Sequence, residues 1–478
     1  GICDQFRIMA ETLFDKIWNQ HVISDLGDGN DLIYIDRIFL HERTGSVALK
    51  SLDEKGISVR SPNQVFATID HIVDTLPGRG DATMMPSGTQ FIESLRESVR
   101  REKINFFDLN TSRQGIVHVV SPELGIALPG ITYICPDSHT CSLGALGALA
   151  WGVGSSECEH ALATNTLIKE KPKSMLVMIN GVPKDGVTAK DIILYLISEH
   201  GANGANGHAI EFRGKTIDEM SIESRLTLCN MAVEFGAMTG IMSPDEKTID
   251  YISGKAFAPK EEEQELAEEY WAKLKSDEDA HFSKVIEIDA SKLSSYVTWG
   301  TSPEHAIEIE EKIPSINQAN SSKENESIKK ALEYMGLQEN DAIKGTKIDA
   351  AFIGSCTNSR LSDLRVAASI LEGKKIAPGI KAICVPGSST VKKDAESEGL
   401  DKIFISAGFE WRESGCSMCF FAGGESFGEN ERVISTTNRN FENRQGKKTR
   451  THLASPATVA ASAIKGEITA ADQMERRA

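Results

Sequence analysis

Short apolar runs alternate with amphipathic stretches along most of the chain. Runs of strand length occur at residues 175–179, 350–353 and 381–385, and apolar positions at helical spacing occur at residues 189–198 and 362–371. Uninterrupted apolar strands are typical of parallel sheets that are covered on both faces. The alternation predicts an α/β protein with mostly parallel sheets flanked by helices.

Two polar stretches interrupt this pattern. Residues 260–279 are rich in glutamate and are predicted to form a solvated helix, whereas residues 317–330, rich in Asn, Ser, Lys and Glu, are predicted to form a linker. Residues 201–208 have the composition of a phosphate-binding loop but lack its lysine and serine, so a flexible turn is favoured. Residues 1–8 precede Met9 and are set aside as an extension or a cloning remnant.

Length and charge restrict the classes of function. At 478 residues the chain exceeds one compact core, so several domains are expected. Its 52 basic and 69 acidic residues give a net charge of −17, which disfavours nucleic acid as a partner. An anionic small substrate would need a local basic pocket. The lack of a long apolar stretch or a basic-apolar leader favours a cytoplasmic protein without membrane contact.

The sequence has nine cysteines, which are expected to be reduced thiols because no secretory leader is apparent. Cys135, Cys158, Cys229 and Cys384 lie in apolar surroundings. Free cysteine behaves as a small hydrophobic residue when buried, so these four are interpreted as ordinary core positions.

Three other cysteines form the pattern with the strongest chemical meaning. Cys356 lies in a Gly-Ser-Cys-Thr-Asn-Ser segment between a strand at residues 348–353 and a helix, where ligands collect in open α/β sheets. Cys416 and Cys419 form a C-x-x-C pair. Three thiolates leave a metal centre one open position, whereas structural zinc and electron-carrying clusters normally take four protein ligands. For the C-x-x-C pair alone, zinc, a redox thiol pair and simple burial stay open.

Histidines next to acidic residues are further candidates. An alternating strand at residues 65–73 carries Asp70 and His71 near its end, and a neighbouring carboxylate can orient an imidazole and raise its basicity. A histidine without a catalytic role is the alternative for His71. An apolar strand at residues 116–120 carries His118, whose imidazole needs a hydrogen-bond partner when buried.

Two more pairs follow from spacing. Asp137 and His139 are two positions apart on a chain expected to be extended, so both side chains project to the same side. The apolar positions within residues 226–237 predict a helix, on which Asn230 and Glu234 lie one turn apart. A lone glutamate on a helix is more often solvated surface.

Two arginines, Arg439 and Arg444, flank a loop rich in turn-forming residues. Paired guanidinium groups can bind carboxylates through bidentate hydrogen bonds, as a dicarboxylate substrate of an acidic protein requires. Exposed surface charges are the alternative for both.

Ordered motifs extend over the chain from Met9 onward. They are Tyr34-Ile-Asp-Arg37, Ala67-Thr-Ile-Asp-His71, Gly115-Ile-Val-His118, Asp137-Ser-His-Thr140, Leu228-Cys-Asn-Met231, Gly354-Ser-Cys-Thr-Asn-Ser-Arg360, Gly415-Cys-Ser-Met-Cys419, Asn438-Arg-Asn-Phe441 and Thr449-Arg-Thr-His-Leu453. Together they resemble the aconitase superfamily and, within it, the family of bacterial 3-isopropylmalate dehydratase large subunits.

The resemblance implies three aconitase-like domains, at residues 9–170, 171–285 and 286–478, with the site at their interface. It implies one 4Fe-4S cluster held by the three cysteines, with one iron open to substrate. Catalytic roles are implied for Asp70, His71, His118, Asp137, His139 and Glu234. Substrate binding is implied for His41, Ser138, Asn230, Arg439 and Arg444.

The resemblance also implies a reaction and a partner. The expected activity is that of a hydro-lyase of leucine biosynthesis, which isomerises 2-isopropylmalate to 3-isopropylmalate through isopropylmaleate. A swivelling fourth domain with a catalytic serine has no counterpart before Ala478, so a separate small subunit is expected to supply it. Departures from the family pattern at Pro136, Ser414 and Asn443 leave citramalate or another substituted malate as an alternative substrate. A cluster-sensing RNA-binding regulator is a remote alternative, disfavoured by the net charge.

Overall fold

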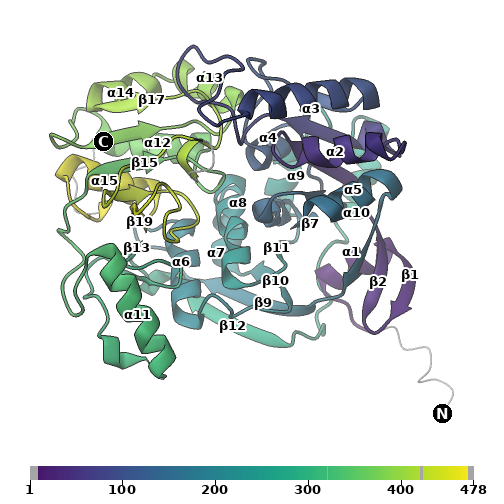
Figure 1. The fold of residues 1–478 in the computed structure, drawn as a ribbon. Helices are drawn as coiled ribbons and strands as arrows, with labels where there is room; N and C mark the ends of the chain where they lie inside the picture. The colour runs from purple at the N-terminus through teal and green to yellow at the C-terminus, as the bar shows by residue number, and fades with distance from the viewer. Residues whose placement is uncertain (1–8, 320, 420–423, 472–478) are drawn as a thin grey trace.

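Three all-parallel sheets form the framework of the computed structural model, which describes residues 9–319, 321–419 and 424–471 (Figure 1). The first sheet has the order β5 (Asn105–Phe107), β4 (Val65–Thr68), β3 (Arg37–His41), β6 (Thr132–Cys135) and β7 (Leu149–Gly152). The second has the order β11 (Thr239–Ile241), β10 (His208–Arg213), β9 (Lys173–Asn180) and β12 (Lys284–Asp289). The third has the order β17 (Phe409–Trp411), β16 (Lys381–Cys384), β15 (Ala350–Ile353), β18 (Arg432–Ser435) and β19 (Arg450–Leu453). The predicted α/β class with mostly parallel sheets is confirmed.

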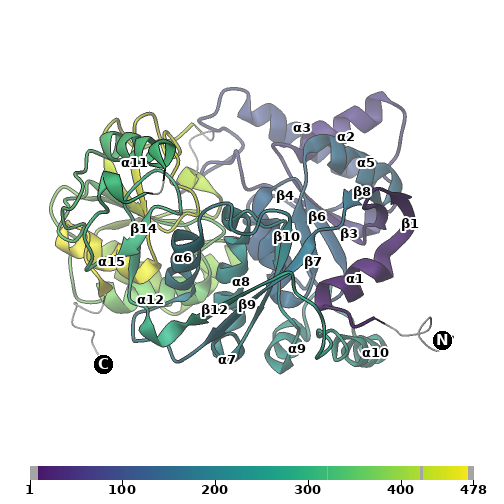
Figure 2. The same cartoon turned by 90° about the horizontal axis from the view of Figure 1, so that it is seen from below.

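Helices flank the three sheets, and Figure 2 shows the third sheet region on one side of the molecule and the first on the other. Around the first sheet lie α1 (Leu13–His21), α2 (Gly45–Glu54), α3 (Gly88–Glu102), α4 (Val117–Glu123) and α5 (Ser155–Thr164). The segment of the second sheet adds α6 (Ala189–His200), α7 (Lys215–Glu219), α8 (Ile222–Asn230), α9 (Glu246–Ile252) and α10 (Glu262–Trp271). The third segment adds α11 (Ser322–Met335), α12 (Leu361–Leu371), α13 (Ser389–Ser397), α14 (Leu400–Ala407) and α15 (Pro456–Lys465).

Two small antiparallel sheets complete the framework. They are β1 (Val22–Gly27) with β2 (Asn30–Tyr34) and β8 (Thr166–Glu170), and β13 (Tyr296–Thr298) with β14 (Ala306–Glu308). The hydrophobic cores are not confined to single segments, since Leu453 of β19 packs in the core that the first two sheets share. The division into domains at residues 9–170, 171–285 and 286–478 therefore stays a prediction.

Local sequence explains where several helices begin. Helix α6 starts with a capping box, in which Thr188 and Asp191 exchange side-chain and backbone hydrogen bonds. Helix α15 has Ser455 as its N-cap and Pro456 at its first turn, where a missing N–H costs nothing. The all-buried sequence Ala-Ala-Phe-Ile of β15 fits a central strand covered on both faces.

The prediction of a strand at residues 116–120 is wrong, because His118 lies on helix α4. The whole segment is buried, so its apolar run does not distinguish a buried strand from a buried helix. Tertiary contacts decide between them: the Val117 N–H donates to Asp70 Oδ2 at 3.0 Å, and the Ile116 N–H donates to the Gly387 carbonyl at 2.8 Å. Helix-like bonds then return to the Ile116 carbonyl.

The prediction of a linker at residues 317–330 is also wrong. Helix α11 begins after its N-cap Ser321 and buries only Ala331, Leu332 and Met335, all in its last two turns. The exposed first turns carry no apolar periodicity, so the sequence pattern hid the helix. The glutamate-rich stretch does contain the predicted helix, α10, and residues 201–208 are a turn as predicted.

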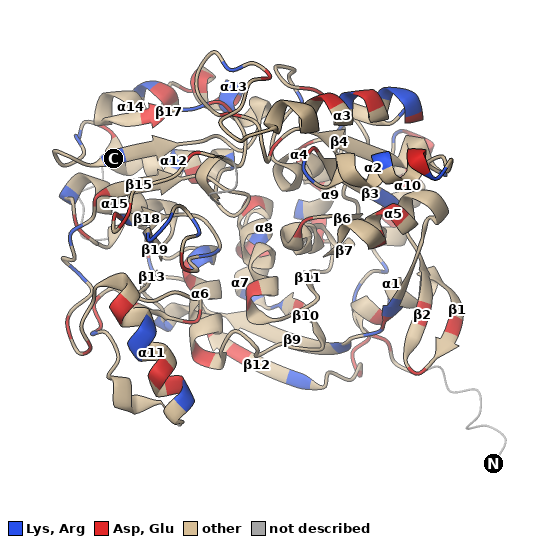
Figure 3. Cartoon of the chain, in the orientation of Figure 1, with Lys and Arg blue, Asp and Glu red and all other residues tan. Residues whose placement is uncertain are grey.

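Charged residues of both signs are interspersed along the chain, for example on α3 and α11 (Figure 3). In the part of the chain that the structure describes, no helix is both long and apolar enough to cross a membrane. The predicted core cysteines Cys135, Cys158, Cys229 and Cys384 are all fully buried, which confirms their interpretation.

Candidate active site

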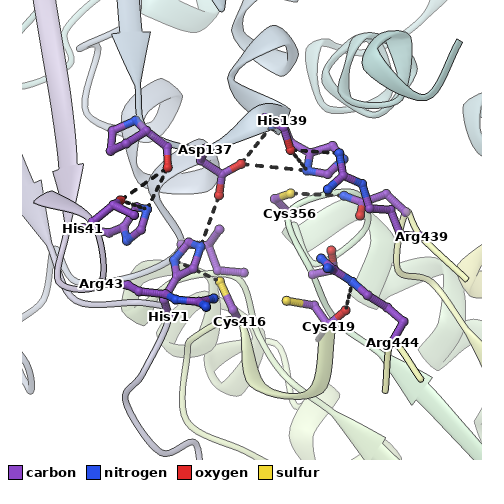
Figure 4. Close-up of a pocket in the computed structure, with 16 residues that line it drawn as sticks. His41, Arg43, His71, Asp137, His139, Cys356, Cys416, Cys419, Arg439 and Arg444 are labelled. Atoms are coloured by element: carbon purple, nitrogen blue, oxygen red, sulfur yellow. Dashed lines mark hydrogen bonds and ion pairs between the residues drawn. The ribbon is translucent and has the colours of Figure 1, made fainter. Parts of the chain in front are cut away.

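A cavity of about 310 Å³ lies beyond the carboxyl ends of strands from the first and third sheets (Figure 4). Ligands bind at this end of the strands in parallel sheets. Many of the predicted site residues line it, namely His41, His71, Asp137, Ser138, His139, Cys356, Cys416, Cys419, Arg439 and Arg444. The other predicted residues, Asp70, His118, Asn230 and Glu234, are buried and contact members of this set.

Two backbone segments bring the three cysteines to the cavity. Cys356 follows β15 in a loop where Ser355 adopts a left-handed conformation with φ of 75°, a strained geometry that is common at functional sites. The Cys416 N–H donates to the Asp70 carbonyl at 2.9 Å, which ties the C-x-x-C turn to the segment that carries His71. The Cys419 N–H donates to the Cys416 carbonyl at 3.1 Å within a short 3₁₀ turn.

Two buried asparagines donate to the Cys356 sulfur. Asn230 Nδ2 lies 3.2 Å from Cys356 Sγ, and Asn438 Nδ2 lies 3.5 Å from it. Asn230 is fully buried and also accepts from Thr357 Oγ1 at 3.0 Å, so its orientation is fixed on both sides. Amide donors aimed at a sulfur favour the thiolate that a metal ligand requires.

The thiols of Cys356 and Cys416 are otherwise held in their protonated forms. Burial raises the pKa of Cys356 to about 12. Hydrogen bonding to Cys419 together with burial raises the pKa of Cys416, and the same bond lowers the pKa of Cys419. Thiols buried in this way become thiolates against a strong local positive charge, such as a metal centre.

His71 lies between two carboxylates. Its Nδ1 forms a short hydrogen bond with Asp70, and its Nε2 lies 3.3 Å from Asp137 Oδ2. Because both ring nitrogens face acceptors, the imidazolium form is favoured. Burial opposes that charge, but Asp70 and Asp137 outweigh it and raise the pKa of His71 well above its usual 6.5.

Asp137 connects the histidines of the site. Besides His71, its Oδ1 lies 3.1 Å from His118 Nε2 and accepts from the His139 N–H at 2.9 Å. Burial alone would raise the pKa of Asp137, yet His118 and His71 hold it well below its usual value. The expected extended conformation applies to Asp137 only, since it is the N-cap of a 3₁₀ helix (Ser138–Leu146) that contains His139.

His41 stacks on His71, with ring centroids 3.7 Å apart and planes at 8°. Its Nε2 contacts the Pro136 carbonyl at 3.2 Å and Thr44 Oγ1 at 3.1 Å. Burial and the neighbouring His71 charge lower the pKa of His41 to about 4. A neutral ring therefore packs against the charged one, on the wall of the cavity.

A second chain of polar groups runs from His139 to Arg439. His139 Nε2 lies 2.6 Å from Glu234 Oε1, and Arg439 Nε donates to the same oxygen at 2.9 Å. Arg439 also donates to Ser138 Oγ at 2.9 Å. Burial alone would raise the pKa of Glu234, but His139 and Arg439 outweigh burial and lower it, so the carboxylate stays ionised. The prediction of one helix for Asn230 and Glu234 is wrong, because α8 ends at Asn230 and Glu234 follows in a separate 3₁₀ turn (Ala232–Phe235).

Comparison with known proteins decides the family. The model of the aconitase family (aconitate hydratase) matches residues 15–466.

The chain belongs to the aconitase family.

A curated protein matches the chain over nearly the full length. The chain is 50% identical over 467 residues to the 3-isopropylmalate dehydratase large subunit 1 of Bradyrhizobium diazoefficiens, covering 98% of each protein. Among solved structures, the holo-form of aconitase X from Thermococcus kodakaraensis covers 92% of this chain and 91% of that chain, at 13% identity and a TM-score of 0.45.

Membership in the aconitase family implies an iron–sulfur cluster, and the donor set fits one. Among the residues that the structure describes, three cysteines and no fourth line the cavity, and such soft sulfur donors suit iron and sulfide more than a hard cation. Among the described residues, only His41, Asp70 and His71 bring three potential ligand atoms within 4.8 Å of one another. The three cysteine sulfurs are not all within this distance of one another. Such a wider spacing fits the ligands of a multi-atom cluster better than those of a single ion. The polar group around His71 is explained by its hydrogen bonds.

Sequence reasoning missed three residues of this site. Glu42 is fully buried and accepts the Asp70 N–H at 2.8 Å and the Ile72 N–H, so it fixes the segment that carries His71. Asn438 contacts the Cys356 sulfur, and Arg43 lines the cavity wall opposite Arg439 and Arg444 (Figure 4). Asn438 lies in the Asn-Arg-Asn-Phe motif, so the sequence did contain a signal for it. A single sequence contains no comparable signal for Glu42 or Arg43.

Proposed function

We propose that this chain is the large subunit of a 3-isopropylmalate dehydratase, a hydro-lyase that interconverts 2-isopropylmalate and 3-isopropylmalate through isopropylmaleate. The observation that carries the proposal is the 50% identity, over 98% of the chain, to a protein of that name. The cavity supports it, because three cysteines, two carboxylate–histidine groups and arginines surround one space.

The cofactor proposed for this cavity is one 4Fe-4S cluster, held by Cys356, Cys416 and Cys419. When bound, such a cluster supplies a Lewis-acidic iron that is open to the substrate. Asn230 and Asn438 would stabilise the negative charge on the Cys356 sulfur through their amide donors. The burial of Cys356 and Cys416 would exclude water from their thiolates.

Two arginines are proposed to bind the substrate carboxylates. Arg439 is held by Glu234 and Ser138 through two of its nitrogens, which orients its guanidinium plane at the cavity wall. Arg444 donates from Nε to the Cys419 carbonyl at 3.2 Å, so its position depends on the cysteine turn. Fixed guanidinium groups lose little entropy when they bind a carboxylate, which favours recognition of a dicarboxylate.

Proton transfer is proposed for the two histidine groups. His71, charged and flanked by Asp70 and Asp137, can give a proton to a departing hydroxyl group. Burial lowers the pKa of His139, although Glu234 opposes the effect, so a neutral His139 can accept or return a proton. His118 Nε2, which lies 3.1 Å from Asp137 Oδ1, would fix the position of the Asp137 carboxylate.

The remaining element is a partner. A separate small subunit, with a swivelling domain and a catalytic serine, is proposed to remove the C3 proton of the substrate. The large subunit would then supply cofactor, carboxylate binding and protonation, while the small subunit completes the cavity.

Anaerobic reconstitution tests this function. The full chain, loaded with iron and sulfide, is mixed with the small subunit and assayed with 2-isopropylmalate, citramalate and 2,3-dimethylmalate. Conversion of 2-isopropylmalate by the mixture, and not by either subunit alone, is expected. Preference for another acid would replace the substrate but keep the chemistry, whereas a loaded complex that is inactive on all three would refute the proposal.

A further inference from the structure

Lys190, near the start of α6, has no solvent exposure. Its Nζ donates to the backbone carbonyls of Thr436 and Thr437, both at 2.8 Å, and approaches Asn358 Oδ1 at 3.4 Å. A buried ammonium group is costly unless acceptors surround it. None of the roles proposed above uses this lysine.

The hydrogen-bond partners of Lys190 favour its charged form, whereas burial opposes it. All three partners are acceptors, and only an ammonium group has three N–H donors for them, because a neutral amine would turn a lone pair toward one acceptor. Burial lowers the pKa of Lys190 to about 7, while the carboxylates of Asp363 and Asp191 oppose that effect. The Asn358 orientation is fixed as well, since its Nδ2 donates to Thr227 Oγ1 at 3.3 Å and Asp363 Oδ1 at 3.1 Å.

The partners of Lys190 belong to the two loops that shape the cysteine site. Asn358 lies two residues after Cys356 in the loop that follows β15. Thr436 and Thr437 follow β18 and lead directly to Asn438, whose amide contacts the Cys356 sulfur. The loops already contact each other, because Thr436 Oγ1 accepts from the Gly354 N–H and donates to the Gly354 carbonyl, both at 2.9 Å. Lys190 adds a contact to both loops from α6, which lies outside the third sheet (Figure 1).

We propose that Lys190 is a positioning residue for the cofactor: its ammonium group holds the Cys356 and Asn438 loops in register and places a positive charge behind the thiolate of Cys356. The proposal rests on the iron–sulfur centre of the proposed function. The competing explanation is that Lys190 only stabilises the packing of α6 against the third sheet. The two differ in whether the properties of the bound centre depend on Lys190.

The test uses the full chain reconstituted anaerobically with iron and sulfide. Lys190→Met removes the charge at similar volume. Asn358→Leu keeps the charge but removes the contact between Lys190 and the Cys356 loop, together with the Asn358 hydrogen bonds to Thr227 and Asp363. Lys255→Met serves as the matched control, because Lys255 is partly buried against Tyr251 and contacts neither loop. Iron and sulfide content, iron retention against a chelator, the electron paramagnetic resonance spectrum and the midpoint potential of the centre are measured beside the thermal unfolding of the metal-free chain.

Both site variants are expected to retain iron about 10- to 100-fold less well against the chelator, as loss of groups that orient metal ligands usually causes. In Lys190→Met, the remaining centre should have an altered spectrum and a more negative midpoint potential, because a positive charge that stabilises the reduced centre is gone. Asn358→Leu decides the outcome if Lys190→Met does not fold.

The proposal would be overturned if the variants had a lower unfolding temperature but a native spectrum, midpoint potential and iron retention. Lys190 would then have only a structural role. A native chain that takes up no iron–sulfur centre would overturn both this proposal and the proposed function. A native chain that binds the centre, with variants that bind it equally well, would remove only the role of Lys190.

Discussion

Replacing Asn230 with aspartate tests whether the Cys356 sulfur depends on an amide donor. Asn230 is fully buried and uses its whole hydrogen-bonding capacity: Nδ2 donates to Ser142 Oγ at 2.8 Å and to Cys356 Sγ at 3.2 Å, and Oδ1 accepts from Thr357 and Asn438. Asn230→Asp keeps the shape and both acceptor contacts. It replaces the donor that faces the sulfur with an oxygen.

The magnitude follows from the distance between these two groups. If a carboxylate and a thiolate stood 3.2 Å apart, their repulsion would be about 5 kcal/mol at an effective dielectric constant near 20. That exceeds the roughly 1.5–3 kcal/mol of one hydrogen bond to a charged group, so the two charges do not coexist. Either the aspartate stays protonated or Cys356 stays a thiol. The variant is therefore expected to bind less iron and sulfide than the unsubstituted chain at neutral pH, and this difference should narrow as the pH falls and the aspartate is protonated.

The assay measures iron and sulfide per chain after anaerobic reconstitution, across a range of pH, together with urea unfolding of the metal-free chain. Asn165→Asp is the matched control, since Asn165 is buried, donates to the Ile35 carbonyl at 3.2 Å and lies outside the cavity. The control should lose stability but keep the cofactor. Full iron and sulfide content in Asn230→Asp at neutral pH would refute the reasoning.

Other changes probe the remaining contacts. Cys419→Ser should lose most of the iron and sulfide while the metal-free chain unfolds at nearly the native urea concentration; retention of the full centre in this variant would exclude Cys419 as a ligand. Glu42→Gln turns an amide toward the Asp70 or Ile72 N–H and should cost about 1–3 kcal/mol in unfolding free energy, with Glu54→Gln on an exposed helix end as control. His21 has Nδ1 facing the Ile17 carbonyl at 2.7 Å and Nε2 facing Asp36 at 2.6 Å, and its pKa is raised because this carboxylate outweighs burial. A histidine whose pKa is raised by folding stabilises the folded state fully below its unfolded pKa of 6.5, and this contribution is lost as the pH rises through the folded pKa. The urea midpoints of the native chain and of His21→Gln should therefore differ most below pH 6.5 and converge at higher pH.

The sequence predicted the framework where its physical signals were local. Continuous apolar runs marked β9, β15 and β16, and helical spacing marked α6 and α12, because buried parallel strands and amphipathic helices differ in period and length. The cysteine pattern and its loop position after β15 were predicted for the same reason. The apolar pattern failed to identify α4, because that segment is completely buried. It also failed for α11, because the first turns of this helix are polar and exposed to solvent.

Contacts between distant segments lay beyond such reasoning, and they decide the chemistry of the site. His71 was predictable as a histidine beside a carboxylate, but its charge depends equally on Asp137, which comes from a different strand end. Nothing local distinguishes Lys190 from any other lysine of an amphipathic helix, since its three acceptors come from loops more than a hundred residues away. A buried charge needs such partners, so the sequence can show that a residue is able to act, and only the assembled fold shows which groups make it do so.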